Sequence, residues 1–272
     1  MRRFFFAVLL IVACATIAAA GPGEDADSAY QRGDYALAAQ LYRPLAEQGN
    51  PWAQYDLGLM YSNGQGVPQN VQEAAKWYRK AADQGNAWAQ HNLGLMYESG
   101  KWVPQNTQEA LKWYRQAAEE GHVGAQNNLG LMYDKGKGIP QDAQEAAKWY
   151  RKAADQGDAG AQFNLGVMSE LGRGVLRDDK EAVKWYRRGA EQGVPQAQRN
   201  LGVMYGKGKG VPQDFVRAHM WSNLATTALS SDNGQQAIKN RDLAASRMTA
   251  AQIKKAQEMA RRCQETKFKE CD

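Results

Sequence analysis

Apolar and polar side chains along this chain follow a pattern that recurs every 36 residues. In the first copy, Ala53, Leu57 and Tyr61 lie four residues apart, which predicts one buried face of a helix over residues 50–62. A unit of this size cannot bury its apolar face alone, so its copies stack into a solenoid. Five copies are predicted, at residues 51–86, 87–122, 123–158, 159–194 and 195–230.

The second half of each copy predicts another helix with its own start and stop residues. Asn70 and Glu73 have the spacing of a capping box, in which each side chain bonds the backbone N–H of the other residue. Gly85 suits the left-handed residue that follows a helix C-terminus. Trp77 recurs among alanines and is expected to fill the core, while Gly58 on the first helix indicates a neighbouring helix that crosses too closely for a side chain.

The two ends of the array differ from its middle. Residues 25–50 resemble a shorter, tetratricopeptide-like first unit, whose loop between helices is reduced to Gly33 and Asp34. Residues 231–272 are expected to form C-terminal capping helices over about 235–247 and 250–267, because the last unit of a solenoid needs a cover.

The recurring motifs A-x-x-x-L-G-x-x-Y, G-x-G-V-P-x-[DN], A-x-x-W-Y and A-A-x-x-G resemble those of the Sel1-like repeat (SLR) family, a relative of tetratricopeptide repeats. The resemblance extends over about residues 30–262. It implies an all-α fold, a right-handed α/α superhelical solenoid that serves as an adaptor for other proteins, with roles in envelope assembly, signalling or host contact in exported bacterial members. Trp102, Ser169 and Leu176 depart from the motifs and leave the local loop or packing open.

The N-terminus has the pattern of a secretory signal peptide over residues 1–20. Arg2 and Arg3 precede an apolar run, and small residues up to Ala20 provide a cleavage site. The alternative is a lipoprotein anchored through Cys14. Either processing route predicts an exported protein, periplasmic or secreted. The mature chain is expected to lack a transmembrane segment, because no other stretch approaches the roughly 20 apolar residues required.

Charge and cysteine content narrow the classes of partner. Loss of the signal peptide lowers the formal charge from +5 to +3, which is too small to indicate a nucleic-acid partner. Cys263 and Cys271 remain, and export to an oxidising compartment favours a disulfide between them over two free thiols, the alternative. Lys76, Arg79 and Lys80 are expected to pair with acids one turn away on a solvated outer face.

Positions that differ between copies are the candidates for binding a partner. Beside the buried stripe of each first helix lies a face that lines the concave groove in the related tetratricopeptide units. The predicted partner-binding residues on this face are Trp52, Tyr55, Asp56, Leu59, Trp88, His91, Asn92, Leu95, Asn127, Asn128, Phe163, Asn164, Arg199 and Asn200. Aromatic side chains provide anchors, and the recurring asparagines form a ladder whose amides can bond the backbone of an extended peptide.

Two alternatives for these residues stay open. The asparagines could bind neighbouring backbone within the superhelix, and Trp52 and Trp88 could cover the short first unit. Both readings give these residues a structural role only.

Catalytic chemistry is not indicated. His91, His122 and His219 lie in different copies without the spacing of a metal site, and S-x-x-K does not occur. We therefore expect no catalytic residue, metal or cofactor. The expected function is an exported protein–protein interaction scaffold that binds a segment of a partner. The alternatives are a cell-wall carbohydrate (peptidoglycan) binder or a β-lactamase-like enzyme, although the cysteine pair in each repeat of the exported relatives linked to β-lactam hydrolysis is absent. The oligomeric state is not predicted.

Overall fold

The computed structural model describes residues 22–226, 232–268 and 271, which form fourteen α-helices. The predicted signal peptide and Cys14 lie outside the described residues. The helices are α1 (Pro22–Gln31), α2 (Tyr35–Glu47), α3 (Pro51–Asn63), α4 (Val71–Asp83), α5 (Ala87–Ser99), α6 (Thr107–Glu119), α7 (Val123–Lys135), α8 (Ala143–Asp155), α9 (Ala159–Leu171), α10 (Asp179–Glu191), α11 (Pro195–Lys207), α12 (Phe215–Thr226), α13 (Asp232–Ala245) and α14 (Ala250–Glu265).

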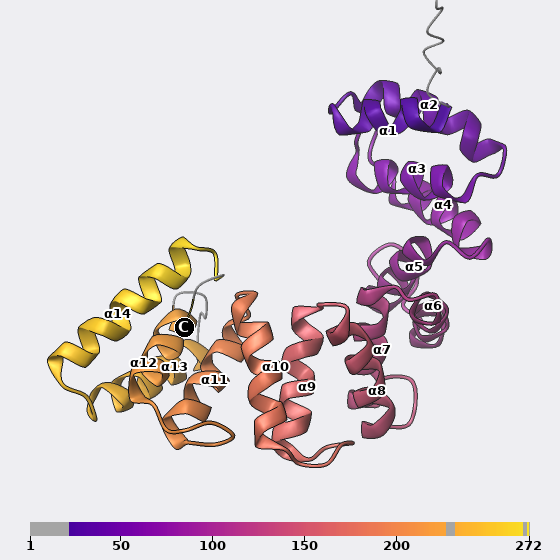
Figure 1. The fold of residues 1–272 in the computed structure, drawn as a ribbon. Helices are drawn as coiled ribbons and strands as arrows, with labels where there is room; N and C mark the ends of the chain where they lie inside the picture. Colours follow the sequence, from indigo (N-terminus) through magenta and orange to yellow (C-terminus); the bar gives the residue numbers. More distant parts are fainter. Residues whose placement is uncertain (1–21, 227–231, 269–270, 272) are drawn as a thin grey trace, which may run out of the picture.

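The helices are stacked in chain order. From α1 to α13 each helix packs against the next, and the stack bends into an arc (Figure 1). The first helix of each repeat is an odd-numbered helix from α3 to α11, and the second is the even-numbered helix that follows. The prediction of an all-α solenoid built from helix pairs is confirmed.

The start of each second helix is only partly as predicted. Oδ1 of Asn70 accepts the backbone N–H of Glu73 at 3.0 Å, which is the expected cap. The capping box also predicts that the backbone N–H of Asn70 donates to the Glu73 side chain, and this is wrong. That N–H donates instead to the carbonyl of Tyr61 at 2.9 Å. The end of the first helix therefore replaces the acid as acceptor. Asn106, Asp142 and Asp178 repeat this arrangement. Thr249 and Gln252 form a complete capping box at the start of α14.

In four of the five repeats the glycine on the first helix lies against a tyrosine ring, and in the fifth Gly202 lies against Ser222. A Cβ at Gly58 would stand 2.8 Å from Cδ1 of Tyr78, on the second helix of the same repeat. The expected close approach is thus made by a tyrosine side chain rather than by a helix backbone. The same pairing joins Gly94 to Tyr114, Gly130 to Tyr150 and Gly166 to Tyr186. The recurring tryptophans are buried and fill the core, as predicted, and the recurring methionines are buried with them.

A row of buried glutamines joins neighbouring repeats, which the pattern of apolar residues does not predict. Nε2 of Gln54 donates to the carbonyl of Ala46 at 2.9 Å, and its Oε1 accepts Nε2 of Gln84 at 2.8 Å. Gln126 with Gln156 and Gln162 with Gln192 repeat the side-chain bond. The row is interrupted at Gln90, because Glu120 stands at the position of the donating glutamine. Among the described residues, the buried Oε1 of Gln90 has no hydrogen-bond partner.

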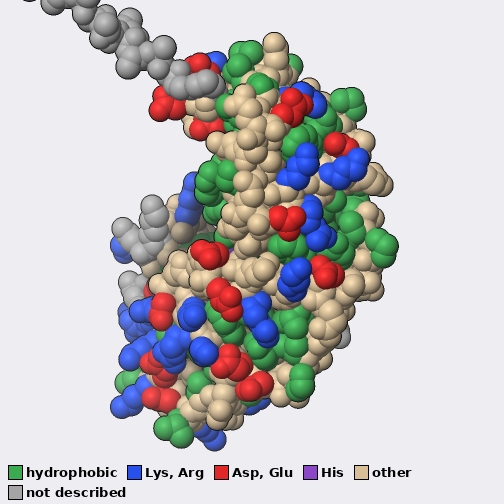
Figure 2. All heavy atoms as spheres, turned by 90° about the vertical axis from the view of Figure 1, so that its right-hand side faces the viewer, with side chains coloured by type: hydrophobic (Ala, Val, Ile, Leu, Met, Phe, Trp, Pro, Cys, Tyr) green, Lys and Arg blue, Asp and Glu red, His purple; other side chains and the backbone are tan. Residues whose placement is uncertain are grey.

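On the outer face, Lys76 makes the ion pair that the sequence predicts, whereas Arg79 makes other contacts. Lys76 pairs with Glu73 at 2.8 Å, as predicted. Arg79 instead donates to the hydroxyl of Tyr97 in the next repeat and lies 5.0 Å from the centre of the Trp113 ring. It therefore links repeats rather than pairing with an acid. Figure 2 shows Lys and Arg side chains interspersed with Asp and Glu over the face that it presents.

The C-terminal end closes the stack. Helix α13 packs on α11 and α12, and α14 packs on α12 (Figure 1). A disulfide joins the buried Cys263 to Cys271 and returns the tail to this end of the core. Phe268 lies between the two cysteines in sequence, and its ring would stand 3.1 Å from a Cβ at Gly193.

Candidate functional site

The predicted partner-binding residues belong to one row of helices, α3, α5, α7, α9 and α11. Three of their side chains are well exposed, namely Trp52 at 57%, Trp88 at 51% and Leu95 at 40%, and the others are half-buried. The row is therefore continuous along the stack, while its open aromatic side chains lie on the first two repeats.

Rings from the first helices pack on the tyrosines of the second helices. Burial raises the pKa of these tyrosines above the usual range, so their hydroxyls stay protonated. The hydroxyl of Tyr114 donates to Glu98 and that of Tyr186 to Glu170, each at 2.8 Å. The ring pairs are Tyr55 with Tyr78 at 5.9 Å between centroids, His91 with Tyr114 at 5.9 Å and Phe163 with Tyr186 at 6.2 Å. Each of these ring contacts joins the first helix of a repeat to the second helix of the same repeat.

The asparagine ladder contacts side chains of the adjacent repeat. Nδ2 of Asn128 lies 3.3 Å from Nε2 of His91, and Nδ2 of Asn164 donates to Oδ1 of Asn127 at 3.5 Å. Both contacts are long for hydrogen bonds. Asn92, Asn128 and Asn200 also hydrogen-bond the hydroxyls of Tyr78, Tyr114 and Tyr186. An asparagine amide offers two N–H donors and a carbonyl with two lone pairs, so these contacts leave part of its capacity for a ligand.

A cluster of three rings lies where α5 meets the start of α7. The His91 ring stacks on His122 at 4.4 Å, and Trp88 meets His122 edge-on at 4.5 Å. Burial, aided by the charge of His122, lowers the pKa of His91 to about 4, so His91 is neutral at pH 7. His122 caps α7, because its Nδ1 accepts the backbone N–H of Ala125 at 3.1 Å. The neutral His122 ring therefore carries its proton on Nε2.

Asp56 occupies the position that asparagine holds in the other four repeats. Its burial, and then the nearby charge of Asp27, raise the pKa of the Asp56 carboxyl to about 6. The carboxylate is thus costly at neutral pH. No group of three or more His, Cys, Asp or Glu side chains among the described residues has the geometry of a metal site.

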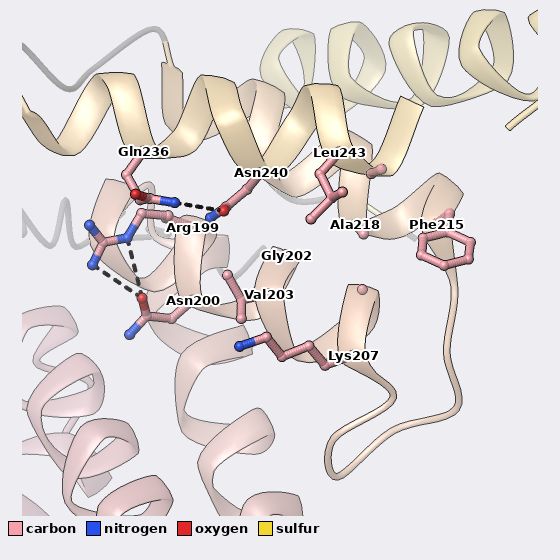
Figure 3. Close-up of a pocket in the computed structure, with 12 residues that line it drawn as sticks. Arg199, Asn200, Gly202, Val203, Lys207, Phe215, Ala218, Gln236, Asn240 and Leu243 are labelled. Atoms are coloured by element: carbon pink, nitrogen blue, oxygen red, sulfur yellow. Dashed lines mark hydrogen bonds between the residues drawn. The ribbon is translucent and has the colours of Figure 1, made fainter. Parts of the chain in front are cut away.

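Arg199 and Asn200 lie in a pocket rather than in an open groove. A cavity of about 380 Å³ lies among α11, α12 and α13, and Figure 3 shows Val203, Phe215 and Leu243 along it. Nε of Arg199 lies 3.4 Å from Oδ1 of Asn200. The sequence predicts α13 as a cap of the last repeat. The structure shows that α13 also forms one wall of this pocket. Its pocket-lining side chains are Gln236, Asn240, Leu243 and Ala244.

Trp52 and Trp88 line two shallow pockets beside the turns between repeats. One pocket, of about 330 Å³, lies between the two indoles and also contacts Asn86 and Glu120. The second, of about 430 Å³, is lined by Trp88, Glu120 and His122. Both indoles remain about half exposed, and neither belongs to the apolar cluster of the first unit. The sequence does not predict Asn86, Glu120 and His122 as site residues. Glu120 and His122 carry a signal, because Glu120 replaces a recurring glutamine and His122 replaces the Asn or Asp of the neighbouring copies, whereas Asn86 matches Asn50.

None of the described helices has the length and apolar character that crossing a membrane requires. The Sel1 repeat model matches residues 26–50, 53–86, 89–122, 123–158, 159–194 and 195–228. No curated protein matches the chain.

Two solved structures share both sequence and fold with it. The Sel1 repeat protein from Oxalobacter formigenes is 38% identical, with a TM-score of 0.71 over 76% of this chain and 86% of that chain. The protective antigen c5321 of uropathogenic Escherichia coli, which displays an SLR fold, is 32% identical, with a TM-score of 0.62. That match covers 92% of this chain and 62% of the antigen, so the chain spans less than two thirds of the antigen's length. These matches agree with the helix pairs and the repeated glycine–tyrosine packing. The chain therefore belongs to the Sel1 repeat family.

Proposed function

We propose that this protein is an exported scaffold that binds an extended segment of a partner protein along the row of α3, α5, α7, α9 and α11. The observation that carries the proposal is the asparagine ladder, defined as Asn92, Asn128, Asn164 and Asn200. These amides recur at the same place in four consecutive repeats and are only half-buried. An extended backbone presents donors and acceptors at regular intervals, and a row of amides can match both.

The surroundings of the ladder support a polypeptide ligand. Tyr55, His91 and Phe163 are held by their ring contacts, so little side-chain entropy is lost when a partner binds. Trp52 and Trp88 are exposed and add apolar anchors at one end of the row. The disulfide between Cys263 and Cys271 favours export, because such bonds persist in oxidising compartments.

The test begins with a photo-crosslinking amino acid placed at Asn92 in cells that express the full chain. Mass spectrometry identifies the linked segment, which is then made as a synthetic peptide. We expect the peptide to bind the purified protein and the double substitution Asn128→Ala, Asn164→Ala to weaken binding about tenfold or more. The melting temperature should fall less than in the control below, because the contacts to His91 and Asn127 are long and the Tyr114 hydroxyl keeps Glu98 as its acceptor when Asn128 is removed.

The matched control is Gln126→Ala with Gln162→Ala, which removes two fully bonded framework amides from the same helices. That variant should lose stability. If the asparagine variant melts as low as the glutamine variant, the ladder belongs to the framework. If it binds the peptide as tightly as the wild type, the proposed face is wrong.

A second candidate function is carbohydrate binding, which the two exposed indoles favour. Flat apolar faces beside polar side chains suit a sugar ring as well as a peptide. No arrangement of side chains in the described part of the chain favours the β-lactamase-like alternative, and we propose no enzymatic activity.

A further inference from the structure

The repeat fold does not require tryptophan at positions 52 and 88. The same place in the later repeats is held by Gly124, Gly160 and Gln196. Both indoles are nevertheless about half exposed, side by side on the pocket that they share. Large exposed aromatic side chains without a structural role are typical of binding surfaces.

The pockets beside the indoles contain a buried donor that lacks an acceptor. Asn86 is 6% exposed and lines the pocket between Trp52 and Trp88. Its Oδ1 accepts the backbone N–H of Ala89 at 2.9 Å and caps α5. Its Nδ2 has no hydrogen-bond partner within the described residues. Leaving such a group unsatisfied is unfavourable, so an occupant that brings an acceptor within its reach is favoured.

The neighbouring pocket repeats this arrangement with a different side chain. His122 uses Nδ1 as the acceptor of its helix cap, which leaves the proton on Nε2. Nε2 is buried and likewise without a partner in the described part of the chain. Each pocket is therefore lined by a residue whose buried donor is unpaired and whose acceptor is engaged in a helix cap.

Glu120 is the one charged side chain among the residues that line these two pockets. It replaces the glutamine found at positions 84, 156 and 192, and it is exposed. A carboxylate here attracts a cationic group on an occupant.

We propose that Trp52, Trp88, Asn86, Glu120 and His122 form a second binding site, the tryptophan edge, which takes a proline-rich polypeptide segment with an adjacent Arg or Lys. Proline rings supply apolar surface for the indoles. A polyproline II backbone has carbonyl acceptors and, at each proline, no N–H donor, which matches two donors without acceptors. Its preformed shape also lowers the entropy cost of binding, as in other aromatic-lined grooves that recognise such segments.

This site shares Trp52 and Trp88 with the proposed function, but it uses none of the asparagine ladder and adds Asn86, Glu120 and His122, so the two proposals can fail separately. A glycan differs in chemistry, since its hydroxyls are donors as well as acceptors, and it enters the test as a competing outcome.

The experiment measures binding to the purified protein by isothermal titration calorimetry. The probes are an acetylated, amidated decaproline, the same peptide with one flanking arginine, a glycine–serine peptide with the same arginine, and a tetramer of N-acetylglucosamine. We expect saturable binding of both proline peptides, tighter for the one with arginine, and no saturation with the other two probes.

Variants drawn from the chain's own repeats locate the site. Trp52→Gln and Trp88→Gln copy Gln196 and should each weaken binding about tenfold. Asn86→Asp copies Asp158, which caps Ala161 at 2.6 Å, so it keeps the helix cap and removes the donor. It should weaken binding of neutral decaproline about threefold to tenfold. Glu120→Gln copies Gln156 and should make the affinities for the two proline peptides equal.

Several results would overturn the proposal. The first is that neither proline peptide shows saturable binding. The second is that both tryptophan variants bind the proline peptides as tightly as the wild type. The third is that the sugar tetramer binds tightly and the tryptophan variants abolish that binding. If a tryptophan variant melts below the wild type, Asn86→Asp and Glu120→Gln decide the outcome. The ladder variant Asn128→Ala, Asn164→Ala should bind decaproline normally, so failure of the concave face and failure of this site are distinguishable.

Discussion

The ring of Tyr114 lies so close to Gly94 that a Cβ on residue 94 would stand 2.4 Å from Cε1 of the tyrosine. The two residues lie on α5 and α6, the two helices of one repeat. Because the tyrosine is fully buried and its hydroxyl is held by Glu98, the ring cannot move aside without disturbing the core. The glycine thus sets how closely the two helices pack.

Gly94→Ala should destabilise the protein by about 1–3 kcal/mol, because overpacking outweighs the better helix propensity of alanine. Gly206→Ala is the matched control. It also lies in a first helix, but its added Cβ would meet Ala218 at an ordinary 3.6 Å, so its stability should be unchanged or raised. Urea denaturation checks both variants, and equal effects would contradict the prediction.

Glu120→Gln should stabilise the protein by about 1 kcal/mol, because the new amide can donate to the orphaned Oε1 of Gln90. Gln156→Glu should have the opposite effect, since it removes the donor to Gln126. Chemical denaturation at pH 7 measures both. A Glu120→Gln variant no more stable than the wild type would show that the gap in the glutamine row has no energetic cost.

Asp56→Asn should raise stability at pH 7 by about 1–3 kcal/mol, since the substitution removes a carboxylate that burial penalises. The pKa of Asp56 is raised from 3.8 to about 6, so the penalty is full above pH 6. It fades as the pH falls toward 3.8, because the folded state takes up the proton first. The gain over wild type should therefore vanish near pH 4, which denaturation curves at several pH values can test. If the gain in stability persists at pH 4, its cause is not the ionisation of Asp56.

His91 should give the opposite pH dependence. Its pKa is lowered from 6.5 to about 4, so the unfolded chain binds a proton before the folded chain does. Stability is retained above pH 6.5 and is lost as the pH falls toward 4, by about 2–3 kcal/mol in all. His91→Asn copies Asn127 and should flatten this slope. The comparison is best made in the Asp56→Asn background, where the opposing titration is absent.

Replacing both Cys263 and Cys271 by serine should lower stability by about 2–3 kcal/mol, because so short a loop restricts the unfolded chain little. The loss should be local, since each unit of a solenoid contacts only its neighbours. Hydrogen exchange should increase at the end of α14 and around Phe268, while α3 to α6 remain protected. Increased exchange throughout the stack would contradict this.

The sequence was sufficient for the helices because each is specified locally. The spacing of Ala53, Leu57 and Tyr61, the Asn70 cap and the positive φ of Gly85 (87°) all act within one unit. Contacts between units were harder to predict. In the sequence, Gln54 cannot be told from the exposed polar residues around it. The structure shows that it is buried and that it bonds Ala46 and Gln84.

The candidate site was predicted less completely, for a related reason. The face of the first helices follows from helical period alone, so its residues could be named. The wall formed by α13 could not, because the 36-residue register is lost before it. His122 was weighed as a metal ligand, whereas its Nδ1 caps a helix and its ring stacks on His91.

The closure of the stack by α13 and α14 also limits what the molecule can assemble into. A solenoid end with an uncovered apolar face could accept another copy and grow into a filament. Here α13 covers α11 and α12, α14 covers α12, and the disulfide secures the returning tail. Another copy could stack on α11 and α12 through this end only if α13 and α14 first left the core.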